Sequence, residues 1–458
     1  MFEQAKKHNH HSSTFQNNMM QNERIVAGLD IGTTKICVLV GKLNPYGKLE
    51  ILGVGRAISE GVKEGVISNI NKTIFAISQA IEEAEKSSGI AIRVVNVGIA
   101  GQHIKSSVHH GSITRGSKDG EITLSDVNRL TSDMYRIVTE PGTDIIHVMP
   151  QQYTVDYEPN IKDPIGMAGV RLEADFHVIT AQTNAIKNIK RCVERVGLEI
   201  ESLILEPLAS ALSVLSQEEK EAGVAIVDIG GGTTDIAIFK EGIIKHTAVI
   251  PFGGHIITAD IKQGCAVMQN QAELLKVKFG RCLAEGAPEN EVVSIPGLRN
   301  RAPKEISIKN LSYIIEARAE EMVDMVYSEI VKGGFKNKLA GGVVLTGGGA
   351  LLQHFRELFE KRTGLEVRIG YPNEYLGKSI DDSVKNPMYA TSVGLVLAGF
   401  KTIDEREHFQ TETSTAGQPA SMTSEQQGKE NSKGGFFANI LRKTKELLID
   451  DFDDKSSY

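Results

Sequence analysis

One pattern occurs twice in this chain, as Ile25-Val-Ala-Gly-Leu-Asp30-Ile-Gly32-Thr33-Thr34-Lys35 and as Val224-Ala-Ile-Val-Asp228-Ile-Gly230-Gly231-Gly232-Thr233-Thr234. In both copies an apolar run ends in aspartate, and glycine and paired threonines precede a second apolar run. Short β-branched runs on either side of such a turn predict a hairpin. Because the copies lie almost half a chain apart, we interpret them as an internal duplication.

The residue types in these two turns are typical of a phosphate site. Glycines at a turn tip let backbone N–H groups approach phosphate oxygens, and a carboxylate can hold Mg²⁺ through the metal's water ligands. One copy alone is also an ordinary hairpin turn, so the prediction depends on the repetition. We expect nucleotide contacts from Asp30, Gly32, Thr33, Thr34, Lys35, Asp228, Gly230, Gly231, Gly232, Thr233 and Thr234, with Asp30 and Asp228 acting on Mg²⁺ through water.

A third glycine-rich turn follows the apolar run Val343-Val-Leu-Thr346 as Gly347-Gly348-Gly349. We expect a strand to end here and a helix to begin at once and run to about residue 362. Helix N-termini attract anions, and glycine permits close approach of a base or an α-phosphate. A tight turn that serves packing alone is the alternative. No Gly-Lys-Ser/Thr follows, so the turn is not a Walker loop.

These motifs, with Glu-Pro-x-Ala between them, occur in an order that resembles the superfamily of actin, sugar kinases and DnaK-type chaperones. Within it the chain most resembles the FtsA family of bacterial division proteins, over about residues 24–401 and again at the C-terminus. The resemblance implies an α/β fold, namely an actin-like (ribonuclease H-type) duplicated ATPase clamp with an inserted strand-helix-strand-strand subdomain. It also implies that ATP and Mg²⁺ are the cofactors.

The resemblance carries over to individual positions. Glu206, in Leu205-Glu206-Pro207-Leu208-Ala209, would position the attacking water; a structural role at a strand-to-helix junction is the alternative. Residues 389–394 would form a helix on which the halves pivot. Asp235 is expected to pair with Lys35 or to serve structurally. The nucleoside side would be formed by Glu273, Lys276, Gly347, Gly348 and Gly349.

The resemblance also divides the chain into subdomains. The first half would comprise residues 24–93, 182–218 and 380–401, and the second half 219–259 and 337–379. Residues 94–181 would form the inserted module, and 260–336 the outer part of the second half.

Within the inserted module we expect strands at 94–99, from 145 and from 171. Thr123 and Asp126 stand at capping-box spacing before a helix at 124–135. His103, His109 and His110 are expected in an exposed loop.

The family resemblance implies the partners. The C-terminal tail of FtsZ would dock on residues 260–336, and the inserted module would contribute to self-association into filaments and to contacts with later division proteins. The basic residues Arg299 and Arg301 are interpreted as part of a solvated loop. The alternative function is an actin-fold kinase for a sugar or polyol with a membrane-associating tail, although no motif for a second polar pocket stands out.

The two ends of the chain differ from the middle. Residues 1–23 show no periodicity and are expected to be disordered, and residues 402–432 are typical of a flexible linker. Residues 433–449 predict an amphipathic helix for an anionic membrane surface, although the acidic tail at 450–458 counts against binding. Its membrane face would consist of Phe436, Phe437, Ile440, Leu441, Lys443, Lys445, Leu447 and Leu448.

The composition excludes several classes of protein. A net charge of −7 argues against a chain built to hold nucleic acid. The four cysteines form no CxxC pair, which favours a reducing compartment. No apolar run approaches the roughly 20 residues that span a bilayer. These features favour a cytosolic protein. The family resemblance and the C-terminal helix add the expectation that it is peripheral to the cytoplasmic face of the bacterial inner membrane, at the division septum.

Overall fold

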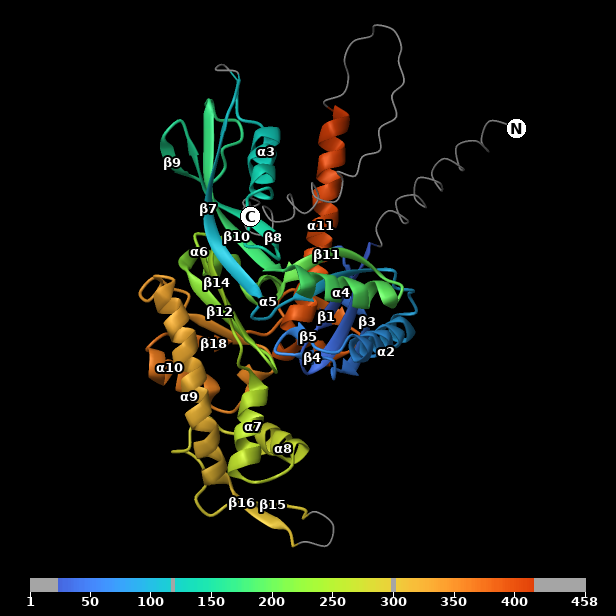
Figure 1. Cartoon of the computed structure of the whole chain (residues 1–458), viewed down its shortest axis with the longest axis vertical. Coiled ribbons are helices and arrows are strands. Elements are labelled where there is room, and N and C mark those ends of the chain that lie inside the picture. The colour runs from blue at the N-terminus through green and yellow to red at the C-terminus, as the bar shows by residue number, and fades with distance from the viewer. Residues whose placement is uncertain (1–23, 117–119, 298–301, 416–458) are drawn as a thin grey trace, which may run out of the picture.

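The computed structural model describes residues 24–116, 120–297 and 302–415. Two α/β halves lie side by side, a small module of strands and one helix lies beyond one end of them, and two helices and a ribbon extend from the other end (Figure 1). Within the described residues, no helix combines the length and apolarity needed to cross a membrane.

The first half is built on a six-stranded sheet of order β11-β6-β1-β2-β3-β19. β1 and β2 form the predicted hairpin, and β1 pairs in parallel with β6. Helices α2 and α4 cover one face, and α11 covers the other. The elements are β1 (Ile25–Ile31), β2 (Lys35–Leu43), β3 (Leu49–Ile58), β4 (Val62–Lys63), β5 (Val66–Ile67), α2 (Ile70–Ser88), β6 (Val94–Ile99), α4 (Thr183–Arg195), β11 (Glu199–Leu205), β19 (Leu376–Ser379), η2 (Asp382–Lys385), η3 (Pro387–Tyr389) and α11 (Ala390–Thr415).

The second half repeats this plan in a five-stranded sheet of order β14-β13-β12-β17-β18. β12 and β13 form the second hairpin, and β12 pairs in parallel with β17 as β1 does with β6. The duplication expected from the sequence is therefore present in the strand pairing. The elements are α5 (Glu206–Val214), α6 (Gln217–Ala222), β12 (Val224–Ile229), β13 (Thr234–Lys240), β14 (Ile243–Ile250), α9 (Ile308–Lys332), β17 (Val343–Thr346), η1 (Gly349–Leu351), α10 (Phe355–Thr363) and β18 (Val367–Ile369).

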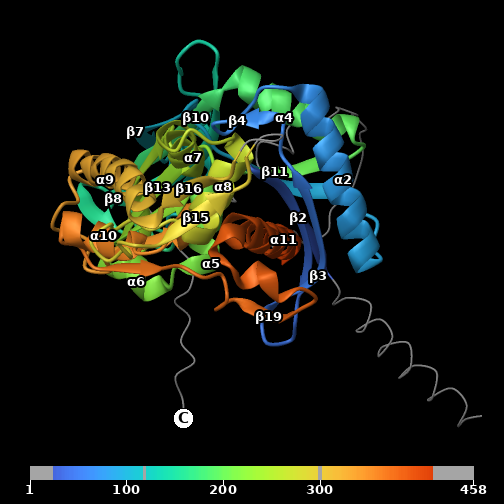
Figure 2. The same ribbon diagram turned by 90° about the horizontal axis from the view of Figure 1, so that it is seen from below.

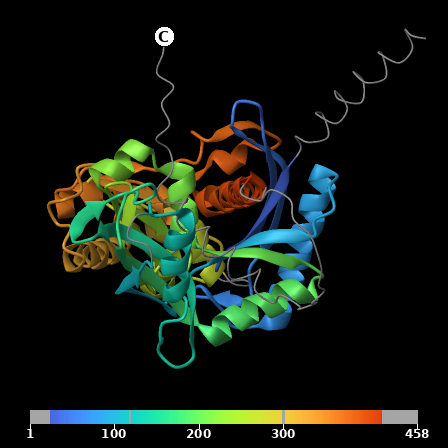
Figure 3. The same ribbon diagram turned by 90° about the horizontal axis from the view of Figure 1, so that it is seen from above.

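Helices α5 and α11 pack against each other between the two halves. Seen from below and from above, α11 lies between the strands of the first half and the second half (Figures 2 and 3). A Cβ on Gly394 of α11 would lie only 1.8 Å from the carbonyl oxygen of Ala209 on α5. The contact therefore depends on a residue without a side chain.

The outer part of the second half adds α7 (Gly254–Gly264), α8 (Gln269–Phe279), β15 (Val292–Ile295) and β16 (Lys304–Ser307).

The inserted module is a four-stranded sheet of order β7-β10-β8-β9 with one helix against it. The predicted capping box between Thr123 and Asp126 begins the helix, and Leu130 of the helix packs with Phe176 of the sheet in one apolar cluster. The elements are β7 (Ile104–Thr114), α3 (Leu124–Met134), β8 (Thr143–Val155), β9 (Glu158–Ile161) and β10 (Arg171–Gln182).

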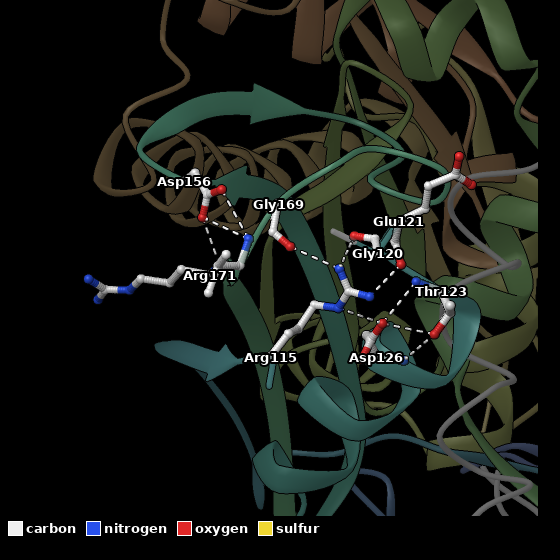
Figure 4. A network of polar contacts seen from close by, with 9 residues as sticks. Arg115, Gly120, Glu121, Thr123, Asp126, Asp156, Gly169 and Arg171 are labelled. Carbon is white, nitrogen blue, oxygen red and sulfur yellow. Dashed lines mark hydrogen bonds and ion pairs between the residues drawn. The ribbon is translucent and has the colours of Figure 1, made fainter. Parts of the chain in front are cut away.

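A half-buried arginine fixes the loops of this module (Figure 4). The Nη1 atom of Arg115 donates to the carbonyls of Gly120 (2.6 Å) and Gly169 (2.8 Å), and its Nε lies 3.1 Å from Oδ2 of Asp126. One guanidinium thus joins the start of α3 to the loop before β10, because its donors form a rigid planar fork.

Several expected boundaries are wrong. β6, expected as the first strand of the module, pairs with β1 and β11 in the first sheet. β19, assigned to the second half, pairs with β3. α11 runs to Thr415, through the first part of the expected linker. An apolar pattern predicts that a segment forms a strand, but it does not predict which sheet the strand joins, because the pairing of strands depends on the rest of the fold.

The expectation of an exposed loop of histidines is only partly right. His110 is exposed but lies with His109 within β7, and His103 lies in the turn before β7 but is buried. The predicted tail at 1–23, the remainder of the linker, the membrane helix and the acidic tail lie outside the described residues, as do Arg299 and Arg301.

Candidate functional site

A cavity of about 430 Å³ lies between the two halves, where the turns of both hairpins meet the glycine turn after β17. The structure brings together there nearly all residues predicted to hold a nucleotide. Thr234 is the exception, because it is buried and its hydroxyl donates to the Phe252 carbonyl at 2.7 Å. The predicted residues that line the cavity are Asp30, Gly32, Thr33, Thr34, Lys35, Glu206, Asp228, Gly230, Gly231, Gly232, Thr233, Glu273, Lys276, Gly347, Gly348 and Gly349.

Four carboxylates converge on this cavity. Burial, reinforced by the charges of Asp30, Asp235 and Asp228, raises the pKa of Glu206 well above its usual value. Burial also raises the pKa of Asp30 and Asp228, and it raises that of Asp235 to about 7. Lys35 lowers the pKa of Asp30 and Asp228 by less than burial raises it, so its charge offsets only part of this negative potential, and such a buried group of carboxylates favours a cation.

The donor set fits Mg²⁺ held through water. In the part of the chain that the structure describes, no three His, Cys, Asp or Glu side chains form a group that could hold a metal directly. Mg²⁺ commonly keeps several waters and takes few protein ligands. Asp30 and Asp228 would hold such an ion through its waters, as the sequence predicts.

Hydroxyl groups from the two connecting helices orient these aspartates. Ser392 of α11 donates to Asp30 Oδ2 at 2.7 Å. Ser210 of α5 and Thr391 of α11 donate to Asp228 Oδ2 at 2.6 and 3.0 Å. Each carboxylate is therefore tied to the helices that join the halves, and a rotation of those helices would move it.

The two hairpin turns face each other closely. A Cβ on Gly231 would lie 2.0 Å from Thr34 Oγ1, and one on Gly232 would lie 2.7 Å from Thr33 Oγ1. The second turn therefore needs glycine to stand opposite the first. A ring nitrogen of His255, from α7, also lies beside these turns: its Nε2 is 3.4 Å from Thr34 Oγ1.

Lys35 lies on the cavity wall with its ammonium engaged. The Nζ atom donates to the Met388 carbonyl at 2.6 Å and lies 3.4 Å from the centre of the Tyr389 ring. Burial is the main cause that lowers its pKa. Two roles were expected for Asp235, an ion pair with Lys35 or a structural one. The ion pair does not occur among those of the described residues, whereas Asp235 accepts a hydrogen bond from Thr233 Oγ1 at 2.9 Å.

Two predicted residues of α8 stand on the far side of the cavity. Lys276 is buried, and its Nζ donates to the Gly254 carbonyl at 2.9 Å and to Thr258 Oγ1 at 2.8 Å. Its ammonium also lies 2.9 Å from Oε2 of Glu273, whose side chain is 43% exposed. Glu273 thus keeps an accessible carboxylate, a suitable acceptor for sugar hydroxyls.

The three glycines after β17 have different roles. Gly347 has φ +83, and a Cβ there would lie 2.3 Å from Asp228 Oδ1, while one on Gly349 would lie 2.3 Å from Ile229 Cγ2. A Cβ on Gly348 would meet only Met388 Cβ, at 3.9 Å. Packing therefore requires Gly347 and Gly349, and Gly348 leaves space in the cavity.

The expectation that a helix begins at these glycines is wrong. A short 3-10 turn, η1, begins at Gly349, and α10 begins only at Phe355. No α-helix N-terminus therefore stands directly at this turn. Nothing in the composition of the segment distinguishes a 3-10 turn from the first turn of an α-helix.

Sequence reasoning missed four polar residues that support the site: Ser210, His255, Thr391 and Ser392. It named Asp235 but left its role open; in the structure Asp235 pairs across the second hairpin with Asp228, as Cys37 pairs with Asp30 across the first. The hydroxyls of α5 and α11 give no signal in the sequence, because small residues in a helix also indicate close packing.

Family models agree with this architecture. One described as Cell division protein FtsA matches residues 225–394, and one described as SHS2 domain inserted in FTSA matches residues 101–180. A third, described as Hsp70 protein, matches residues 179–249. The SHS2 match begins after β6, in agreement with the strand pairing.

Relatives named Cell division protein FtsA align with most of the chain. That of Pseudomonas aeruginosa (strain PAO1) is 41% identical, over 83% of this chain and 91% of the relative. That of Escherichia coli (strain K12) is 35% identical, over 82% of this chain and 91% of the relative. That of Bacillus subtilis (strain 168) is 37% identical, over 82% of this chain and 84% of the relative.

Solved structures support the fold. The PilM-PilN type IV pilus biogenesis complex matches with a TM-score of 0.58 and 15% identity, over 82% of this chain and 98% of that chain. MreB5 of Spiroplasma citri bound to ADP matches with a TM-score of 0.50 and 16% identity, over 85% of this chain and 98% of that chain. With its actin-like ATPase fold and inserted SHS2 domain, the chain belongs to the FtsA family of cell-division proteins.

Proposed function

We propose that this chain binds ATP with Mg²⁺ in the cleft between its halves, assembles into filaments and ties FtsZ to the cytoplasmic membrane at the septum. The observation that carries the nucleotide proposal is the pair of hairpin turns facing each other across one cavity, with an aspartate before each. MreB5 of Spiroplasma citri, which shares the fold, is bound to ADP, and this supports the same class of ligand here.

In this proposal Glu206 orients the attacking water and accepts its proton. Its carboxylate lies at the first residue of α5, beside Asp30 and Asp228. Bound Mg²⁺ would supply positive charge that offsets the carboxylates and the phosphate oxygens. Burial is the main cause of the raised pKa of Glu206 and the neighbouring carboxylates add to it, so a bound cation would lower that pKa toward the ionised form that a base requires. We propose at most a slow Mg²⁺-dependent ATPase.

The membrane part of the proposal rests on sequence pattern. At 100° per residue, six apolar residues fall in one arc that only Thr444 interrupts, with Lys443 and Lys445 beside it: Phe436, Phe437, Ile440, Leu441, Leu447 and Leu448. Each basic residue near an anionic leaflet contributes on the order of 1 kcal/mol. One such segment binds weakly, so many copies along a filament would be needed for stable attachment.

The partner assignments follow from membership of the FtsA family. We propose that residues 260–336 take the C-terminal tail of FtsZ, and that the inserted module serves self-association and later division proteins. The sugar or polyol kinase alternative is not favoured, because relatives named Cell division protein FtsA align with over four fifths of the chain. ATP turnover that is indifferent to added glycerol or sugars is the expected behaviour.

Liposome flotation tests the tether. The double variant Phe437→Glu/Leu441→Glu places two charges in the apolar arc and should release both the protein and a bound FtsZ tail peptide from anionic vesicles. The matched control, Ala438→Glu/Asn439→Glu, adds the same charge outside that arc and should float like the parent. Flotation of the first variant at the parent's level would rule out the tether.

A further inference from the structure

We infer that His147, from the inserted module, is a positioning residue that holds the start of helix α5 and so places the Glu206 carboxylate in the cavity. The inference rests on the proposed ATP hydrolysis. His147 lies on β8 and is buried, and its Nε2 atom accepts a hydrogen bond from the backbone N–H of Leu205 at 3.0 Å. Leu205 directly precedes Glu206.

The location of this N–H explains why it needs a partner from outside its own sheet. β11 is the edge strand of the first sheet and pairs only with β6 there. Leu205 is its last residue and is 1% exposed. A buried backbone donor without an acceptor costs its full desolvation free energy. The imidazole of the module supplies that acceptor.

Helix α5 begins at this point with Pro207 in its first turn but without a side-chain cap. Leu205 is the N-cap residue, and no side-chain capping bond is formed there. Glu206 follows as the first helical residue, with its side chain against Gly98 of β6, where a Cβ would lie 3.1 Å from Glu206 Cγ. The direction of the carboxylate therefore depends on where the backbone at residues 205 and 206 is held.

Residues of the inserted module also pack against the segment around Glu206. Ile104 and Ser106 of β7 line a small cavity together with Leu205 and Pro207, the neighbours of Glu206. Ile146 and Ile179 of the module belong to the same apolar cluster as Leu205 and Leu208. A displacement of the module, by a neighbouring subunit or a partner, would therefore be transmitted through His147 to the residue proposed to orient the attacking water.

Three variants of the full chain test the inference. His147→Phe keeps a buried ring and removes the acceptor, whereas His147→Gln places an amide oxygen close to the position of Nε2. His177→Phe is the matched control, because His177 is equally buried in the same sheet but contacts Thr247 of β14. The measurements are the Kd for Mg-ATP, the rate of ATP hydrolysis, and hydrogen exchange over residues 205–214.

We expect His147→Phe to lower kcat about tenfold or more with Kd unchanged within twofold, and to speed exchange at the start of α5. His147→Gln should recover most of the rate, and His177→Phe should behave as the parent. If the parent hydrolyses ATP and His147→Phe matches it, or if His177→Phe loses the rate equally, the positioning role is overturned while the proposed function stands. A parent that binds Mg-ATP and never hydrolyses it overturns the hydrolysis proposal, and the positioning role with it.

Discussion

Asp235 shows most clearly what it costs to ionise a carboxyl group buried at the cleft. Its carboxylate is buried, it pairs across the hairpin with Asp228, and its pKa is raised to about 7. Because the folded chain holds this proton more tightly than the unfolded chain, folded-state stability falls as the pH rises from about 4 to about 7. This loss of stability is complete above about pH 7, and it is absent at a pH below the pKa that Asp235 has in the unfolded chain.

Asp235→Asn should therefore stabilise the nucleotide-free chain, and increasingly so as the pH rises. The amide removes the titrating group, so the gain over the parent should grow between pH 5.5 and pH 8 by up to about 2 kcal/mol. Thermal unfolding in EDTA measures it. A melting-temperature difference that is independent of pH would show that Asp235 does not titrate in this range.

Gly348 offers a clean probe of the space for the nucleoside. Since a side chain there meets only Met388, at 3.9 Å, Gly348→Val should fold with the parent's melting temperature and lose Mg-ATP affinity at least tenfold. Gly286→Val is the control, because a side chain at Gly286 would meet nothing within 4 Å and Gly286 lies outside the cavity. Equal ATP affinity for both variants would place the nucleoside elsewhere.

At the scale of elements, the sequence predicted both hairpins and the capped helix α3, because their signals are local: turn glycines, β-branched runs and a capping box. It misplaced β6 and β19, whose sheet membership depends on distant partners, and it ended α11 too early. The site residues could be predicted because the same turn motif occurs twice, and the repetition identified both turns as parts of one site. The supporting hydroxyls of α5 and α11 were missed, since small residues in a helix indicate packing as readily as polar support.

The close contact of α5 and α11 gives an element-scale prediction. Gly394→Ala would put a methyl group 1.8 Å from the Ala209 carbonyl oxygen, so the helices must separate. Overpacking of this kind destabilises by about 1–3 kcal/mol. Because Asp30 and Asp228 bond to these helices, Mg-ATP binding should weaken as well. Denaturant unfolding and calorimetry measure the two effects, and Gly348→Ala, which has space, is the control for stability. An unchanged unfolding midpoint for Gly394→Ala would contradict the tight contact.

On the scale of the whole molecule, the inserted module cannot be removed without exposing the core of the first half, since Ile146 and Ile179 belong to that core. Its surface can be altered instead. Tyr157 on the module is 80% exposed and Tyr46 on the first half is 89% exposed. If the module carries the filament contact, Tyr157→Glu should reduce ATP-dependent assembly seen by electron microscopy, and Tyr46→Glu should not. The reverse outcome would move the contact away from the module.

The central claim is that the duplicated hairpins form one Mg-ATP site between the halves. Calorimetric titration of the full chain with ATP in the presence of Mg²⁺ tests it most directly, with Asp30→Ala and Asp228→Ala compared against the parent. Loss of a group that holds the metal through water typically costs about 10–100-fold in affinity, so the parent should bind and each variant should bind at least tenfold more weakly. Undiminished binding by both variants, or no binding by the parent, would contradict the account.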